Sequence, residues 1–92
     1  MYFVINCIDK PGKLELRQKT RPDHINYLNK YENQIVAVGP TLNDELPNGS
    51  VIIIELDDYE AAQAFAEGDP YSKVGLFEIV TIKPWKKVFP RD

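Results

Sequence analysis

Apolar and polar positions divide the chain into short segments that are typical of alternating strands and helices. Segments rich in β-branched and aromatic residues predict strands at residues 2–8, 34–38, 51–56 and 75–83. Helices are expected at residues 21–32 and 59–67. This order predicts the α+β class and a single ferredoxin-like βαββαβ sandwich domain over residues 1–92. Right-handed crossovers then give an antiparallel sheet with the strand order 4-1-3-2.

The expected start of the first helix depends on two residues. Thr20 is a candidate N-cap and Pro22 suits a first helical turn, so residues 13–19 are expected to form a loop. His24 then lies near a helix N-terminus, where the helix dipole disfavours a charged imidazole. Helical spacing places His24 on the packed face, together with Tyr27, Leu28 and Tyr31.

Turn residues mark the other boundaries. Residues 41–49 are expected to form a polar loop that closes on Pro47-Asn48-Gly49. Asp57 or Asp58 is expected to cap the second helix. Gly68 is expected as the C′ residue of that helix, and Pro70 should prevent its continuation.

In this topology, five separate pieces of the chain meet at one end of the sheet. They are residues 9–10, 21–24, 39–40, 49–50 and 69–77. Loops carried at one end of a rigid sheet are where binding and catalytic sites usually lie. We therefore expect Asp69 to lie within hydrogen-bond reach of His24, directly or through one water.

Both faces of the two predicted central strands are apolar. In residues 2–8, Tyr2, Val4 and Ile8 share one face, and Phe3, Ile5 and Cys7 share the other. A sheet with helices on one side and water on the other should alternate apolar and polar residues. Since no further element is available to cover the second face, we expect a homodimer through the sheet face.

Composition narrows the classes of function. The net charge of −3 argues against a nucleic-acid partner. No apolar run reaches the length of a membrane span, so no membrane association is expected. No cationic and apolar leader precedes the first strand, and the single Cys7 cannot form an internal disulfide, so a cytoplasmic location is expected.

The candidate chemistry centres on His24, the only histidine of the chain. An imidazole suits proton transfer near neutral pH, and the Asp69 carboxylate could orient it. The alternative is a histidine that only packs under its helix. Scattered acids, one histidine and one cysteine give no metal-ligand spacing, and no glycine-rich phosphate loop is present, so neither a metal nor a cofactor is expected.

The other candidate residues would bind substrate. Arg21 could bind a carboxylate or a phenolate, with a solvated side chain as the alternative. Ser50 could hydrogen-bond substrate, whereas no nucleophile-elbow pattern supports it as a nucleophile. Pro40, Tyr71 and Phe77 complete the set at the same end of the fold, with a core position as the alternative for Phe77.

Short motifs along nearly the whole chain resemble, in order, those of the YCII-related (YciI-like) family. These motifs are Asp9-Lys10-Pro11-Gly12, Leu16-Arg17, Arg21-Pro22-x-His24-x-x-Tyr27-Leu28, Gly39-Pro40, Gly49-Ser50, Asp69-Pro70-Tyr71, Gly75-Leu76-Phe77 and Pro84-Trp85. The resemblance implies a dimeric α/β-barrel of ferredoxin-like subunits and a His–Asp active-site dyad. His24 matches the family histidine, Asp69 the aspartate and Ser50 a pocket serine.

Most members of this family have no assigned reaction, and one related enzyme class removes chloride from a chlorinated hydroxyhydroquinone. The chain departs from the family after Gly39-Pro40, where residues 41–46 replace an apolar run. Substrate identity therefore does not carry over.

Two hypotheses of function follow. The first is a small cofactor-independent enzyme that uses His24 and Asp69 for elimination, isomerisation or hydrolysis of a small polar or aromatic metabolite. The second is a non-catalytic dimeric domain that binds a small ligand or serves as an accessory unit.

The apolar second face of the sheet generates the first testable prediction. Equilibrium ultracentrifugation at micromolar concentration should give about twice the chain mass of 10.6 kDa. A folded chain that sediments as a monomer would contradict the argument from the sheet.

Overall fold

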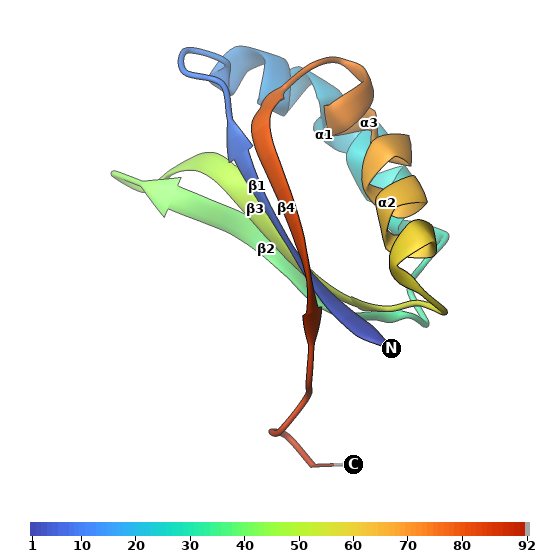
Figure 1. The fold of residues 1–92 in the computed structure, drawn as a ribbon. Coiled ribbons are helices and arrows are strands. Elements are labelled where there is room, and N and C mark those ends of the chain that lie inside the picture. Colours follow the sequence, from blue (N-terminus) through green and yellow to red (C-terminus); the bar gives the residue numbers. More distant parts are fainter. Residues whose placement is uncertain (92) are drawn as a thin grey trace.

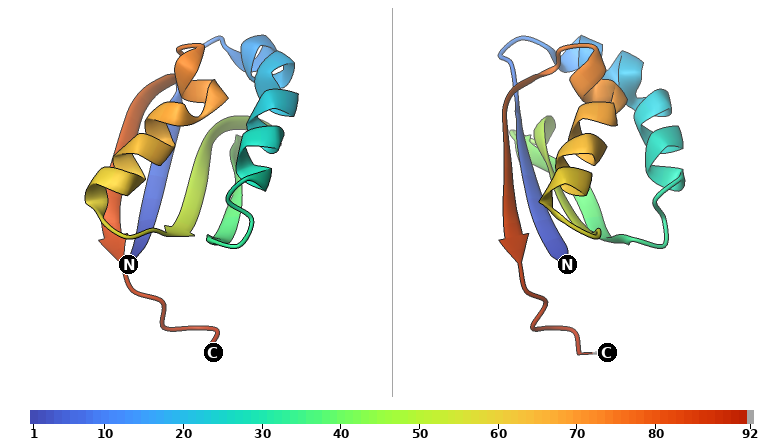
Figure 2. Two further views of the ribbon diagram at one scale, coloured as in Figure 1. Left: turned by 90° about the vertical axis from the view of Figure 1, so that its right-hand side faces the viewer. Right: turned by 45° about the vertical axis from the view of Figure 1, so that its right-hand side comes forward.

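The computed structural model describes residues 1–91, in which four antiparallel strands carry every helix on one face of the sheet (Figures 1 and 2). The sheet order is β2-β3-β1-β4, so the predicted order and the ferredoxin-like fold are confirmed. The elements are β1 (Tyr2–Asp9), α1 (Leu14–Asn29), β2 (Ile35–Asn43), β3 (Leu46–Glu55), α2 (Tyr59–Gly68), α3 (Pro70–Lys73) and β4 (Phe77–Trp85).

The core lies between the helices and one face of the two central strands. Phe3 and Ile5 of β1 and Ile54 of β3 have no exposed surface, and Ile52 has almost none. The register pairs Phe3 with Ile54 and Ile5 with Ile52, so these side chains share the helix-facing side. Phe65 of α2 packs onto them from above the sheet. A one-residue slip would turn the whole set to the other face, and this fixes the register.

Helix α1 begins seven residues earlier than predicted. Residues 14–19 are helical rather than loop, and Thr20 is a buried mid-helix residue rather than an N-cap. Pro22 lies inside the helix, where it removes one backbone hydrogen bond. The buried stripe of α1 runs Arg17, Thr20, His24, Leu28, which is mostly polar, so hydrophobic spacing could not reveal its first half.

His24 therefore lies in the middle of α1, and the expectation that it sits near a helix N-terminus is wrong. The argument from the helix dipole fails with it, since that effect is confined to the first and last turns. The electrostatic environment of His24 is therefore set by its tertiary contacts and not by a helix end.

Strands β2 and β3 form a long hairpin through the segment expected to be a loop. Residues 41–43 and 46–49 are strand, and the turn lies at Asp44 and Glu45, both with positive φ angles. Two consecutive positive φ values are typical of a type I′ turn, in which Asn-Gly is the usual signal. Asn48-Gly49 offered that signal but lies within β3, which explains the wrong prediction.

The junction of α2 and α3 also differs from expectation at Gly68. This glycine is the last residue of α2, and the C-cap is Asp69 with extended backbone. A residue that precedes proline is forced away from helical geometry, and Asp69 precedes Pro70. Asp69 therefore ends α2 and begins α3, for which it serves as N-cap. Asp58 caps α2, as expected, by accepting the Ala61 N–H at 2.8 Å.

The face of the sheet opposite the helices carries apolar side chains without cover from this chain. Ile8 and the neighbouring Ile79 are 44% and 50% exposed, and Val4, Val51 and Ile53 are half-buried. Figure 2 shows the helices on one side of the sheet only. The second apolar face is thus present in the folded chain.

Close packing of β3 against its neighbours generates a prediction at Gly49. A Cβ atom at this buried position would overlap the backbone carbonyl oxygen of Cys7. Gly49→Ala should lower the free energy of unfolding by ~1–3 kcal/mol, the usual cost of overpacking. Gly39→Ala is the matched control, because a Cβ there meets no atom within 4 Å. Urea unfolding of both variants measures the difference, and equal stabilities would contradict the close approach.

Candidate functional site

A cavity of about 190 Å³ opens between α1 and the β2–β3 hairpin. Five predicted site residues line it, namely Arg21, His24, Pro40, Ser50 and Tyr71. The lining also includes apolar side chains from both sides, namely Ile25 and Leu28 of α1 and Val38 and Pro47 of the hairpin. A small apolar cavity with a few converging polar groups is the usual form of a ligand site.

His24 and Asp69 meet at the base of this cavity. The Nδ1 atom of His24 lies 2.9 Å from Oδ1 of Asp69, and both side chains are more than nine-tenths buried. Asp69 Oδ1 also accepts the backbone N–H of Tyr71 at 2.9 Å. Because a carboxylate only accepts hydrogen bonds, the proton of a neutral His24 ring is assigned to Nδ1. Nε2 is then left as an acceptor on the cavity side.

The ring of Tyr71 holds the imidazole from one side. The two rings are stacked, with their centroids 4.0 Å apart and their planes at 18°. Burial raises the pKa of Tyr71, so its phenol stays protonated at neutral pH. Stacking on one side and the Asp69 hydrogen bond fix the orientation of the imidazole before any ligand arrives.

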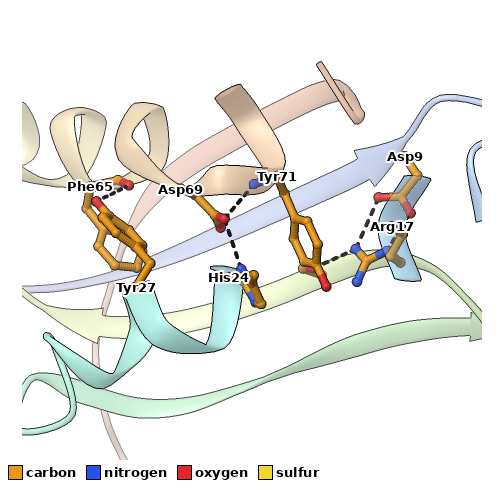
Figure 3. Close-up of polar contacts among 8 residues, drawn as sticks. Asp9, Arg17, His24, Tyr27, Phe65, Asp69 and Tyr71 are labelled. Atoms are coloured by element: carbon orange, nitrogen blue, oxygen red, sulfur yellow. Dashed lines mark hydrogen bonds and ion pairs between the residues drawn. The ribbon is translucent and has the colours of Figure 1, made fainter. Parts of the chain in front are cut away.

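Arg17 is a cavity residue that the sequence analysis missed. Its guanidinium bonds both oxygens of Asp9, with Nε at 2.7 Å and Nη2 at 3.1 Å. Nη2 also donates to the hydroxyl oxygen of Ser50 at 2.8 Å, and the Arg17 Cζ atom lies 4.6 Å from the centre of the Tyr71 ring. Figure 3 shows His24, Tyr71 and Arg17 in a row, with an aspartate behind each end of the row.

Arg17 precedes His24 by seven residues, which is about two helical turns on one face. That spacing would have identified it had the helix been extended back to residue 14. Arg21, which was expected to bind the ligand charge, is exposed at the cavity rim, whereas Arg17 is buried at its base.

Two predicted residues do not line the cavity. Asp69 lies behind His24, where it contacts the imidazole and no cavity surface. Phe77 packs edge-on against Tyr71, with ring centroids 5.9 Å apart, on the side of the core. Phe77 therefore supports the wall rather than forming part of it.

The described residues were compared with the patterns of a metal site and of a membrane-spanning helix. Within residues 1–91, no three His, Cys, Asp or Glu side chains gather as metal ligands would. Among the helices of that same stretch, none combines the length and the apolar character needed to cross a bilayer.

The family model for the YCII-related domain matches residues 1–86, and the chain belongs to that family. The chain is 39% identical to Protein YciI of Escherichia coli O6:H1 over 98 aligned positions, with 97% of this chain and all of the relative covered. An uncharacterized Haemophilus influenzae protein is 37% identical over the same coverage.

Among solved structures, the chain is similar to the 5-chloro-2-hydroxyhydroquinone dehydrochlorinase TftG of Burkholderia phenoliruptrix AC1100, in complex with 2,5-dihydroxybenzoquinone. The TM-score is 0.88 at 33% identity, and 94% of each chain is covered. An antibiotic biosynthesis monooxygenase is similar in fold alone, with a TM-score of 0.56 at 16% identity over 96% of this chain and 99% of the other.

The buried Cys7 next to this site generates a prediction about reactivity. Burial, with the Asp69 carboxylate as the second cause, raises the pKa of its thiol from 9.0 to about 12. Because the thiolate is the reactive form, the folded protein should resist alkylation at pH 8, whereas the urea-unfolded chain should react as a free thiol.

The raised pKa of Cys7 also makes the free energy of unfolding depend on pH. The folded chain retains the Cys7 proton that the unfolded chain loses, so stability should fall as the pH rises from 9.0 to about 12. Alkylation of the native protein as fast as of the unfolded chain would contradict the burial of Cys7.

Proposed function

We propose that this chain is a small enzyme that performs general acid/base chemistry without a cofactor, with His24 as the base. The observation that supports this most directly is the 2.9 Å contact of His24 Nδ1 with the buried Asp69. With a carboxylate as its partner, Nδ1 would carry the ring proton, and Nε2 would be free to take a proton from a bound molecule. Asp69 would then stabilise the imidazolium that forms.

The form of the cavity supports a small polar or aromatic substrate. Its volume of about 190 Å³ suits a single ring, and its apolar wall suits a planar face. The similar protein is a 5-chloro-2-hydroxyhydroquinone dehydrochlorinase, and loss of hydrogen chloride requires the removal of a proton, for which a base at His24 would serve. Elimination, isomerisation and hydrolysis all remain within this proposal, since one imidazole can serve each of them.

We further propose a cytoplasmic homodimer that forms through the sheet face opposite the helices. Exposed Ile8 and Ile79, with half-buried Val4, Val51 and Ile53 beside them, support this arrangement. An apolar sheet face of this extent is unusual on a monomer. A second copy would cover it with the same residues across a two-fold axis.

The experiment is a substrate screen on wild type and His24→Asn side by side. The amide nitrogen of asparagine can replace Nδ1 as a donor to Asp69, while the base at Nε2 is lost. Turnover of any true substrate should fall by ~10²–10⁴, and the melting temperature should move by only a few degrees.

Tyr27→Phe serves as the control on the same helix. It removes a 2.9 Å hydrogen bond to the Phe65 carbonyl but lies outside the cavity, so it should lose about 1 kcal/mol of stability and keep its turnover. Full turnover in His24→Asn would sink the catalytic proposal. Ligand binding without any turnover in wild type would favour a non-catalytic binding domain.

A further inference from the structure

Two large apolar side chains near the C-terminus are not buried by the fold. After β4 ends at Trp85, residues 86–91 form neither helix nor strand, and Figures 1 and 2 show them running beyond the end of the sheet where the N-terminus lies. Val88 is 61% exposed, and Phe89 is 67% exposed although the Arg91 Cζ atom lies 4.8 Å from the centre of its ring. Scattered single apolar side chains are normal on a protein surface, but these two are adjacent and lie next to an apolar face.

That face is the open face of the sheet, which is the face opposite the helices. Residues 86–91 border a groove on it with a volume of about 580 Å³. The apolar lining of this groove includes Tyr2, Val36, Ala37, Ile53, Trp85 and Phe89. Tyr2 is paired with Trp85 across the strands, and their rings lie edge to face with centroids 5.9 Å apart. Because Ile53 lies directly opposite Val4, the groove is continuous with the rest of the apolar face.

The chain does not bury these two side chains in its own groove. Phe89 contributes to the groove lining, yet two thirds of its surface stays exposed, and Val88 does not line the groove at all. Burial of both side chains therefore needs the surface of another molecule.

Charge favours a second copy of this chain as that molecule. The chain has 14 acidic and 11 basic residues, and three of the basic ones are Lys86, Lys87 and Arg91. The rest of the chain is therefore more acidic than the net charge of −3 indicates. Glu55 is exposed and lies in the groove itself. A basic segment with two apolar side chains thus complements an acidic chain that carries an apolar groove.

The segment is also long enough to cross from one copy to another. Two sheets packed face to face lie about 10 Å apart. Residues 86–91, when extended, span up to ~20 Å. Because a two-fold axis relates identical surfaces, each copy would offer the segment and the groove at the same time.

We propose that residues 86–91 form an arm exchanged between two copies of this chain, with Val88 and Phe89 of each copy packed against the open face of the other. This inference rests on the proposed sheet-face homodimer and specifies the segment that joins its two copies. Phe89 is the anchor of the arm, since aromatic side chains in an apolar groove contribute most to such contacts.

A mixed disulfide tests where the arm lies. Val88→Cys is mixed with Ile53→Cys and oxidised with oxidised glutathione, and mass spectrometry identifies a product that contains one copy of each variant. This product should dominate, because the arm of one copy reaches the face of the other. Val74→Cys mixed with Ile53→Cys is the matched control, since Val74 is 46% exposed after α3, and it should give only background. The native Cys7 is 3% exposed and should not react.

Dissociation of the dimer tests the contribution of the anchor. Phe89→Ser should raise the dimer dissociation constant at least about tenfold, a difference of about 1.4 kcal/mol, measured by sedimentation equilibrium over a dilution series. Val88→Ser should act in the same direction. Val74→Ser removes an equally large exposed side chain elsewhere, and its effect should stay below about twofold. Circular dichroism of each variant checks that it folds.

A mixed disulfide no more abundant than in the Val74 control, or a Phe89→Ser dimer as tight as wild type, would overturn the exchanged arm. Ile79→Lys charges the open face without changing the arm, so it tests the sheet-face dimer by itself. If Ile79→Lys dissociated the dimer and Phe89→Ser did not, the sheet-face dimer would stand and the arm would fall. A wild-type monomer at every concentration would overturn both. None of these measurements uses turnover, so the arm and the catalytic proposal fail separately.

Discussion

The buried carboxylate of Asp69 is the group on which the candidate site depends. It is 1% exposed, and it accepts hydrogen bonds from the His24 ring on α1 and from the backbone of α3. Its own backbone is extended because Pro70 follows, and this ends α2 where the side chain can reach α1. Asp69 thereby joins α1 to the α2–α3 segment, orients the imidazole and begins the turn that carries Tyr71.

The underside of α1 is polar where a helix normally contributes to the core. Arg17 and His24 are both buried against acidic partners, and these contacts replace apolar packing over two turns. Buried ionic and polar pairs seldom stabilise a protein more than hydrophobic side chains of similar volume would. Their presence on the helix face that lines the cavity is therefore more consistent with function than with stability. The remaining core, around Phe3, Ile5 and Ile54, supplies ordinary hydrophobic burial.

The architecture and the meeting of His24 with Asp69 could be predicted because both depend on the order of the elements. The βαββαβ order puts both helices on one face of the sheet, so the end of α2 lies beside α1 although α1 begins earlier than predicted. The first half of α1 could not be predicted, since its buried positions are Arg17 and Thr20 and carry no apolar period. Because this half of α1 was expected to be a loop, Arg17 was not recognised as a residue of the cavity. The hairpin turn at Asp44 and Glu45 was hidden because Glu45 stands where such a turn usually has glycine, and Asn48-Gly49 offered the usual signal a few residues later.

In the proposed mechanism, Asp69 holds His24 in the form that presents a free Nε2 to the cavity. Nitrogen-15 NMR of the imidazole tests it directly, because the two ring nitrogens differ in shift according to which one carries the proton. At a pH where the ring is neutral, we expect the Nδ1–H tautomer in wild type and a loss of that preference in Asp69→Ala. A wild-type ring protonated on Nε2 would contradict it, because the cavity would then face a donor and His24 could not act as the base.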